Sequence, residues 1–221
     1  MTEPASLPPL WSRLLHVFLA PGSLFAALRE RPRWVGALLL GAVLVTVSSA
    51  VLPTEVWNEM ARRQILESGR PVPEDFGGGM AFRVGATVGT AVFWVVWSFV
   101  VAALVTFVFG VLLGDDGRYR QYLAVTAHGF LVAAVGALLT VPLKIVQRDP
   151  QLTLNLGLFV PLDEGYLLNL LTMLDLFLLW SFVVVSIGIH EVDPRRGVGS
   201  AAVVMLGFAV LMAAGVAFMP R

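Results

Sequence analysis

The pattern of hydrophobic and polar positions divides the chain into five long apolar segments separated by short polar ones. We place the apolar segments at residues 35–52, 84–113, 122–143, 167–189 and 198–219. An α-helix rises about 1.5 Å per residue, so about 20 residues cross the roughly 30 Å hydrocarbon core of a bilayer. The sequence therefore predicts an all-α integral membrane protein with five transmembrane helices in a membrane domain over residues 35–219.

The first 34 residues are predicted to form a cytosolic or interfacial segment. Within it, residues 10–20 fit a short amphipathic helix whose apolar side chains share one side: Leu10, Trp11, Leu14, Leu15, Phe18 and Leu19. This helix is too short to span a bilayer. The arginines that follow, with Trp34, are residue types typical of a membrane interface. We expect residues 10–33 to lie in the headgroup plane; the alternative is a soluble tail packed on the other helices.

Residues 53–83 are predicted to form an extramembrane loop between the first two spans. A helix from Glu55 to Ser68 with one apolar stripe fits the first part of this loop. Pro71, Pro73 and the glycines at 77–79 then indicate a flexible connection. The glycine triplet has no preceding strand and no following Lys-Ser/Thr, so it does not fit a phosphate-binding loop.

Composition supports the membrane class and restricts the chemistry. The chain is 57% hydrophobic and 14% charged, whereas soluble domains have about 25% charged residues. Basic and acidic residues number 15 each, so net charge does not indicate a nucleic-acid partner. The absence of cysteine excludes disulfides, thiolate metal sites and cysteine nucleophiles. No nucleophile–base pair or metal-ligand pattern is visible, so we expect no enzyme and no cofactor.

The basic residues suggest an orientation. With the N-terminus in the cytoplasm, eight Lys or Arg residues fall on the cytoplasmic side and seven on the other. The eight crowd into short turns close to helix ends, where the positive-inside effect operates. We therefore predict a multi-pass protein of the cell's inner membrane with a cytoplasmic N-terminus and an external C-terminus.

The fourth apolar segment carries one formal charge, Asp175. A carboxylate at the centre of a transmembrane helix costs about 2.5–3.5 kcal/mol. On a continuous helix Thr172 and Ser186 would share its face, and hydroxyls at the same depth on other spans are those of Ser48, Ser49, Ser98 and Thr140. We expect Asp175 to be protonated or hydrogen-bonded to these hydroxyls and to fix helix packing. The alternatives are a proton or ion path and a site for a lipid or partner helix.

A second group of polar residues follows the fourth segment. His190, Glu191 and Asp193 supply three potential metal ligands within four residues. Side chains so close together at one helix end cannot all converge on one ion. We therefore favour a solvated helix terminus, with His190 near the negative end of the helix dipole, over a surface metal site.

Several short motifs occur in a fixed order around the five segments. Pro-Gly-x-x-Phe begins at Pro21, and Arg-Pro-x-Trp lies at 31–34, just before the first segment. Tyr-Arg-Gln-Tyr-Leu-Ala-Val-Thr-Ala at 119–127 opens the third segment, and Leu-Asp-x-Phe-x-x-Trp at 174–180 lies in the fourth, with Gly188 near its end. Over roughly residues 20–215 this order resembles the Yip family of five-helix membrane proteins (Ypt/Rab-interacting proteins), in its bacterial branch.

The resemblance implies five spans, a cytosolic N-terminus and a tendency to self-associate or to pair with relatives. Eukaryotic members act in vesicle traffic and bind Rab GTPases, and they carry a longer N-terminal region with an Asp-Leu-Tyr-Gly-Pro-like motif. This chain has no such motif, which makes a GTPase partner doubtful. We expect a non-enzymatic membrane organiser or partner-binding scaffold whose partners are the lipid bilayer and a second copy or another membrane protein. The alternative is a small transporter or channel-like protein that uses Asp175.

Overall fold

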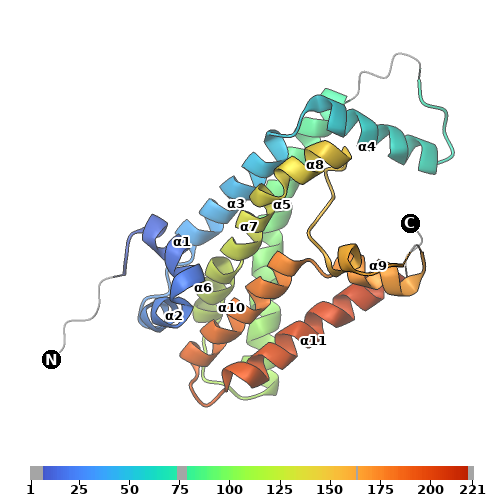
Figure 1. Cartoon of the computed structure of the whole chain (residues 1–221). Helices are drawn as coiled ribbons and strands as arrows, with labels where there is room; N and C mark the ends of the chain where they lie inside the picture. The colour runs from blue at the N-terminus through green and yellow to red at the C-terminus, as the bar shows by residue number, and fades with distance from the viewer. Residues whose placement is uncertain (1–6, 74–78, 163, 219–221) are drawn as a thin grey trace.

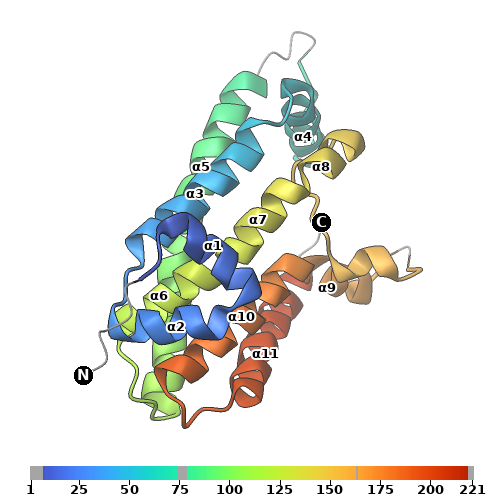
Figure 2. The same cartoon turned by 60° about the vertical axis from the view of Figure 1, so that its left-hand side comes forward.

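A computed structural model describes residues 7–73, 79–162 and 164–218 of the chain. Parts of two predictions, the beginning of the glycine triplet and Met219 at the end of the fifth segment, lie outside these residues. Within them, the chain is an all-helical bundle without β-strands (Figures 1 and 2). The predicted all-α class is therefore confirmed.

The structure has the following helices. They are α1 (Leu10–Leu19), α2 (Pro21–Glu30), α3 (Val35–Ala50), α4 (Thr54–Glu67), α5 (Gly79–Val105), the π-helix η1 (Thr106–Leu112), α6 (Tyr119–Gly129), α7 (Leu131–Leu139), α8 (Val141–Gln147), the 3-10 helix η2 (Leu156–Phe159), α9 (Tyr166–Met173), α10 (Leu176–Val192) and α11 (Val198–Ala217). Helix η1 continues α5 directly, so the second apolar segment forms one long rod.

Three helical stretches among the described residues are long and apolar enough to cross a membrane. They are Met80–Leu112, Tyr119–Leu139 and Val198–Ala217, which correspond to the second, third and fifth predicted segments. The number rises to four if α3 and α4, bent by 84° at their junction, form one broken span. Helix α10 is apolar but only 17 residues long. The structure thus supports three or up to four spans, and the predicted five are not confirmed.

The core lies where α10 meets α2, α6, α7 and α11, and where α3 packs on α5 and α7. Large aromatic side chains fill it and are fully buried: Phe25, Phe109, Tyr122, Phe130 and Phe182. Gly136 of α7 lies against the ring of Phe177, and a Cβ atom at this position would collide with that ring. The glycine therefore allows α7 to approach the first turn of α10.

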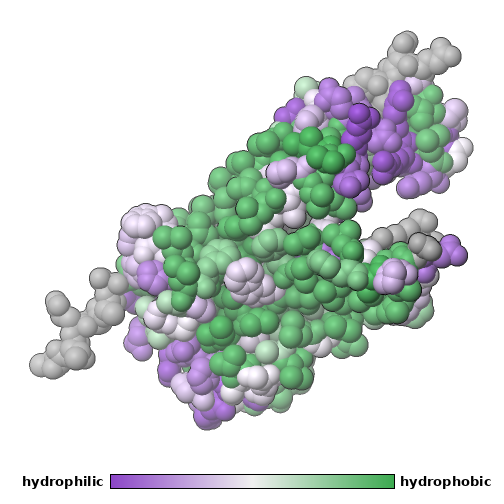
Figure 3. All heavy atoms as spheres, viewed as in Figure 1, coloured by the Kyte–Doolittle hydropathy of each residue, from purple (hydrophilic) through white to green (hydrophobic). Residues whose placement is uncertain are grey.

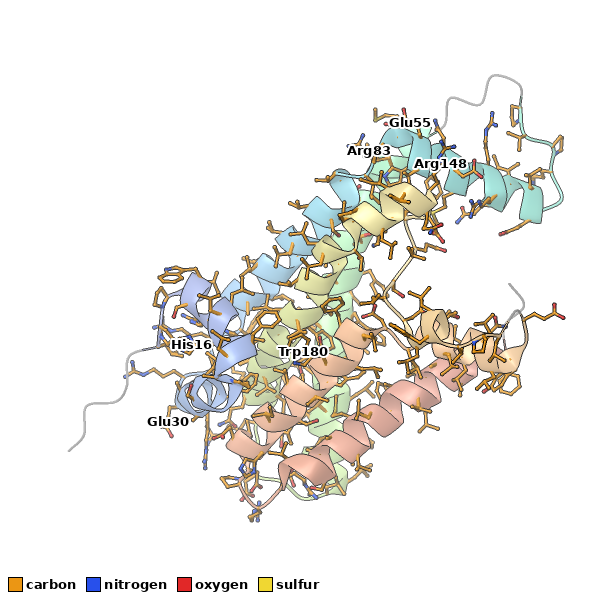
Figure 4. The ribbon with its side chains drawn as sticks, viewed as in Figure 1. His16, Glu30, Glu55, Arg83, Arg148 and Trp180 are labelled. Carbon is orange, nitrogen blue, oxygen red and sulfur yellow. The ribbon has the colours of Figure 1, made fainter. Side chains whose placement is uncertain are left out.

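The surface separates into an apolar middle and polar ends. In Figure 3 hydrophobic residues cover the middle of the visible face, and hydrophilic residues gather at its bottom and at its upper right. Figure 4 shows His16 and Glu30 with α1 and α2, while Glu55, Arg83 and Arg148 gather at the far end with α4 and α8. Trp180 lies between the two groups. An apolar middle between polar ends matches the hydrocarbon core of a bilayer between its two headgroup regions.

The N-terminal helices pack along the side of the bundle. Helix α1 contacts α2, α3, α6 and α7, and the ring of Phe18 meets that of Trp180 edge-on at 5.3 Å. Its outer edge is apolar: Trp11, Leu15 and Leu19 are 69%, 51% and 81% exposed. An exposed apolar row beside packed helices fits an interfacial helix. The expected position of residues 10–33 in the headgroup plane stays a prediction.

Candidate functional site at the helix break and the charged turns

The fourth apolar segment is broken directly beside its one charged residue. Helix α9 ends at Met173 and α10 begins at Leu176, so the predicted continuous helix over 167–189 is wrong. The backbone of residues 154–156, which leads into η2, pairs with the break. The Leu156 N–H donates to the Leu174 carbonyl at 3.1 Å, and the Leu176 N–H donates to the Leu154 carbonyl at 2.8 Å. The backbone groups freed by the break therefore find partners, which is what makes a break tolerable at membrane depth.

Asp175 caps the helix that follows the break. Its Oδ1 accepts a hydrogen bond from the Leu178 N–H at 2.7 Å, and its backbone is extended. A carboxylate at this position satisfies an orphan N–H group and faces the positive end of the helix dipole. Because α10 has 17 residues, Asp175 lies about 25 Å along the helix axis from its far end. The carboxylate thus sits at the end of an apolar helix rather than at its centre, which lowers the cost of its charge.

The six hydroxyl residues expected near Asp175 are not gathered around it. Ser48, Ser98, Thr140 and Ser186 donate to carbonyl oxygens three or four residues earlier on their own helices. Such local bonds are the usual alternative for hydroxyls inside helices. Ser49 pairs with Thr87 at 3.3 Å and so joins α3 to α5. Thr172 donates to the Asn169 carbonyl at 2.9 Å, and the break puts it on α9, off the face of α10.

Asp175 lines an apolar cavity of about 150 Å³ between α5, α10 and α11. The other lining side chains include Trp97, Phe182 and Phe208, and Asp175 is the one ionisable residue among those that line it. Among the described basic groups, Lys144 on α8 is the one whose charge acts on Asp175. Burial lowers the pKa of Lys144, and the negative charge of Asp175 opposes this shift. The cavity has room for an apolar group but does not continue as a series of polar side chains.

A cluster of charged residues joins two turns at the other end of α10. We call Asp115, Asp116, Asp193, Arg195 and Arg196 the charged-turn cluster. Arg195 forms ion pairs with Asp193 at 2.5 Å and with Asp116 at 2.7 Å. Arg196 pairs with Asp115 at 2.6 Å and lies over the Phe109 ring at 5.8 Å from its centroid. The α5–α6 turn is therefore fastened to the α10–α11 turn by side chains of both.

Asp193 is the centre of the charged-turn cluster. Its side chain is only 4% exposed. It accepts hydrogen bonds from the Asp116 and Arg195 N–H groups, both at 3.0 Å, and from the Arg195 guanidinium. The hydrogen bonds from the Arg195 side chain hold the pKa of the Asp193 carboxyl well below its usual range. Asp193 is thus a buried structural anion.

The structure corrects the expectation of a solvated terminus at residues 190–193. Asp193 turns inward, His190 Nδ1 lies 2.7 Å from the Arg196 carbonyl, and Glu191 faces Gly22 of α2. The three side chains thus serve three different contacts. Over the described ranges, no group of three or more His, Cys, Asp or Glu residues is arranged to hold a metal ion.

Sequence reasoning missed the partners of Asp193. Asp115, Asp116, Arg195 and Arg196 were not among the candidate site residues. One signal was available: the two turns carry opposite charges, Asp115-Asp116 in one and Arg195-Arg196 in the other, and the predicted topology puts both on the same side of the membrane. Nothing in the local sequence indicates that residues 154–156 pair with the break at Asp175.

Long apolar helices with polar ends define a multi-pass α-helical membrane protein. Comparison with known families identifies the particular one: the Yip1 domain matches residues 15–219, and the chain belongs to this family. The chain is also 24% identical over 212 residues to the membrane protein YknW of Bacillus subtilis (strain 168), covering 90% of this chain and 87% of the relative. No solved structure is significantly similar to the chain.

Proposed function

We propose that this Yip1-family protein is a non-enzymatic scaffold that organises the membrane or holds a partner protein. The observation that supports this function is the place of Asp175. Its carboxylate caps α10 through the Leu178 N–H and lines a cavity that is otherwise apolar. A residue used in this way stabilises a helix break, whereas a proton or ion path requires a series of polar or ionisable groups.

We also propose that the chain crosses the membrane five times, with its N-terminus in the cytoplasm of the cell and its C-terminus outside. Helices α3 and α10 are short, but each packs lengthwise on longer apolar helices, α3 on α5 and α10 on α11. The inner surface would then carry α2, the start of α6 and the charged-turn cluster. These elements include arginines in short turns close to helix ends, which is where the positive-inside effect is strongest.

Topology can be tested directly because the chain contains no cysteine. We expect Glu67→Cys to react with a membrane-impermeant maleimide in intact spheroplasts, and Arg118→Cys to react only after permeabilisation. The reverse pattern would overturn the orientation. Labelling of both residues from the same side would contradict the proposal that an odd number of spans, here one, separates them.

The proposed partner is a second copy or another membrane protein on the outer face of α5. Valines exposed at four-residue spacing form a continuous row along this helix, which turns about 40° around the axis at each step: Val84, Val88, Val92, Val96 and Val100. Val92→Cys should give a disulfide-linked dimer after oxidation in membranes, or a heterologous adduct. Val203→Cys, on the exposed face of α11, is the matched control. Equal cross-linking at both positions would indicate random collision and count against a specific partner.

The transporter alternative is tested by flux. Purified protein is reconstituted in liposomes, and proton and potassium movement are followed with an entrapped pH dye and under an imposed K⁺ gradient. The scaffold function predicts no flux above protein-free liposomes for the native protein and for Asp175→Asn, because the amide keeps a cap acceptor but cannot titrate. Flux in the native protein that disappears in Asp175→Asn would establish the alternative.

A further inference from the structure

A second cavity, of about 430 Å³, lies where α1 meets the beginnings of α3 and α6. It is separate from the Asp175 cavity and shares none of its residues. Three arginines from three different elements line it: Arg13 on α1, Arg33 in the link before α3, and Arg120 in the first turn of α6. The lining contains no acidic residue. Three like charges thus share one cavity wall.

Arg13 is the unusual member of this group because it is buried. The residue is 8% exposed, and its Nε donates to the Pro8 carbonyl at 2.7 Å. In the part of the chain that the structure describes, neither of its terminal nitrogens has a hydrogen-bond partner, and no acid pairs with Arg13, Arg33 or Arg120. Burial, and after it the charge of Arg33, lowers the pKa of Arg13. The terminal nitrogens of Arg13 are not among the fully buried atoms, so their free donors open into the cavity, where an anion can accept from them.

The beginning of α3 adds donors to the same cavity. Val35 and Gly36 line it, and α3 has no side-chain cap. The first backbone N–H groups of a helix lack intrahelical acceptors, and they mark the positive end of its dipole. A helix N-terminus of this kind is a common binding site for phosphate groups. Gly36 has no side chain of its own, and the Leu10 side chain packs against it.

The rest of the surroundings indicates where the anion comes from. Trp34 lines the cavity, and Leu10 and Val35 give it apolar walls beside the charges. The exposed row of Trp11, Leu15 and Leu19 is on the same helix as Arg13. A ligand that matches both the basic cavity and its apolar surroundings carries a phosphate group next to hydrocarbon chains.

We propose that this cavity binds the phosphate of an anionic phospholipid headgroup, held by Arg13, Arg33, Arg120 and the N-terminus of α3. The phosphate oxygens accept from the free guanidinium donors, which bind phosphate in paired geometry. The bound lipid completes the packing of α1 on α3 and α6. A free phosphate would satisfy the same donors, so the experiment separates the two sources.

The experiment titrates the full-length protein in detergent with dioleoyl phosphatidylglycerol or dioleoyl phosphatidylcholine and counts lipid adducts by native mass spectrometry. The expected result is one tight phosphatidylglycerol site and no comparable phosphatidylcholine site. In Arg33→Gln/Arg120→Gln we expect at least tenfold weaker binding. Both arginines are exposed, so this variant tests the site even if Arg13→Gln does not fold.

The matched control is Arg31→Gln, which removes the same charge from the same link at a residue that does not line the cavity. It should bind phosphatidylglycerol as the native protein does. Equal weakening in Arg31→Gln and Arg33→Gln would reveal a diffuse basic surface and overturn the proposal, as would equal binding of the two lipids. Millimolar inorganic phosphate should not displace the lipid. Full displacement would identify a free anion as the ligand and overturn the lipid assignment.

Discussion

The two ends of α10 use carboxylates in different ways. At its beginning, Asp175 accepts from the Leu178 N–H of its own helix, and the break around it is held by backbone pairing with residues 154–156. At its end, Asp193 accepts from two backbone N–H groups and from an arginine, and Asp116, one of the donors, belongs to a distant turn. The comparison shows that the role of a carboxylate depends on which elements supply its hydrogen-bond donors. Donors from its own helix make it a cap, whereas donors from a distant turn make it a link between elements.

The largest expected effect is at Asp193. Replacing it with Ala leaves the Asp116 N–H without its acceptor and separates the two turns. Hydrogen bonds to a charged group contribute about 1.5–3 kcal/mol each, so we expect Asp193→Ala to lower the free energy of unfolding by about 2–4 kcal/mol. The change in stability is measured by thermal unfolding in detergent, which is monitored as the loss of the monodisperse peak in size-exclusion chromatography. A loss no larger than that of Asp175→Ala would remove the distinction between the ends.

Acid should mimic this substitution. The pKa of Asp193 is lower in the folded protein than the value of about 3.9 of an unfolded chain. Its stabilisation is therefore fully present above about pH 4 and is lost as the pH falls below that value. We expect the native protein to lose stability below about pH 4 more steeply than Asp193→Asn does. Parallel pH profiles would contradict the assignment.

The packing beside the break should be the next most sensitive feature. Gly136→Ala places a methyl group against the Phe177 ring, which immediately follows the capping residue. Overpacking of this kind costs about 1–3 kcal/mol. Gly207→Ala on α11 is the control, because a Cβ there meets nothing within 4 Å. Similar stability of the two variants would show that α7 does not hold the first turn of α10.

Loss of the cap itself should be milder. Asp175→Ala removes the acceptor of the Leu178 N–H, and lost N-caps cost about 0.5–2 kcal/mol. Asp175→Asn should recover most of this, since the amide oxygen can accept the same bond. Thermal unfolding of the pair is the measurement. An Asn variant as unstable as the Ala variant would mean that the negative charge matters more than the cap.

The smallest effect is expected at Asp116. Its side chain is 86% exposed where it meets Arg195, and exposed ion pairs contribute about 0–1 kcal/mol. Asp116→Asn keeps the backbone N–H that Asp193 uses, so stability should change by less than about 1 kcal/mol. The same thermal assay checks this, with Asp193→Ala as the reference. A larger loss of stability would mean that the Asp116 side chain, rather than that of Asp193, contributes most of the stabilisation by the charged-turn cluster.

Features set by short stretches of sequence were predictable. The helical class and the long apolar helices follow from runs of apolar residues, because each residue adds its own preference for lipid. Asp175 was found for the same reason, as one charge in an apolar run. Its role was not, since the position of a carboxylate on a helix depends on where the helix begins. That beginning is set by residues 154–156, which are about 20 positions away and carry no signal of their pairing.

The contacts within the charged-turn cluster could not be predicted from the sequence either. The charges of Asp115 and Arg196 are obvious in the sequence, but their distance of 2.6 Å depends on which turns become neighbours. Charge counts gave only an orientation. The buried state of Arg13 is also invisible in sequence, because the polar side of an amphipathic helix is expected to face water.

The attachment of α11 has a consequence for the order in which the protein assembles. This helix packs on α10 and α9, and the charged-turn cluster fixes the turn that leads into it. All contacts among α1 to α10 are encoded before residue 198. Helix α11 is therefore the last of the described helices to join the bundle during synthesis. Arg195 and Arg196 are the last basic residues before α11. Their ion pairs fix the turn and so set the position in which α11 packs beside the preceding helices.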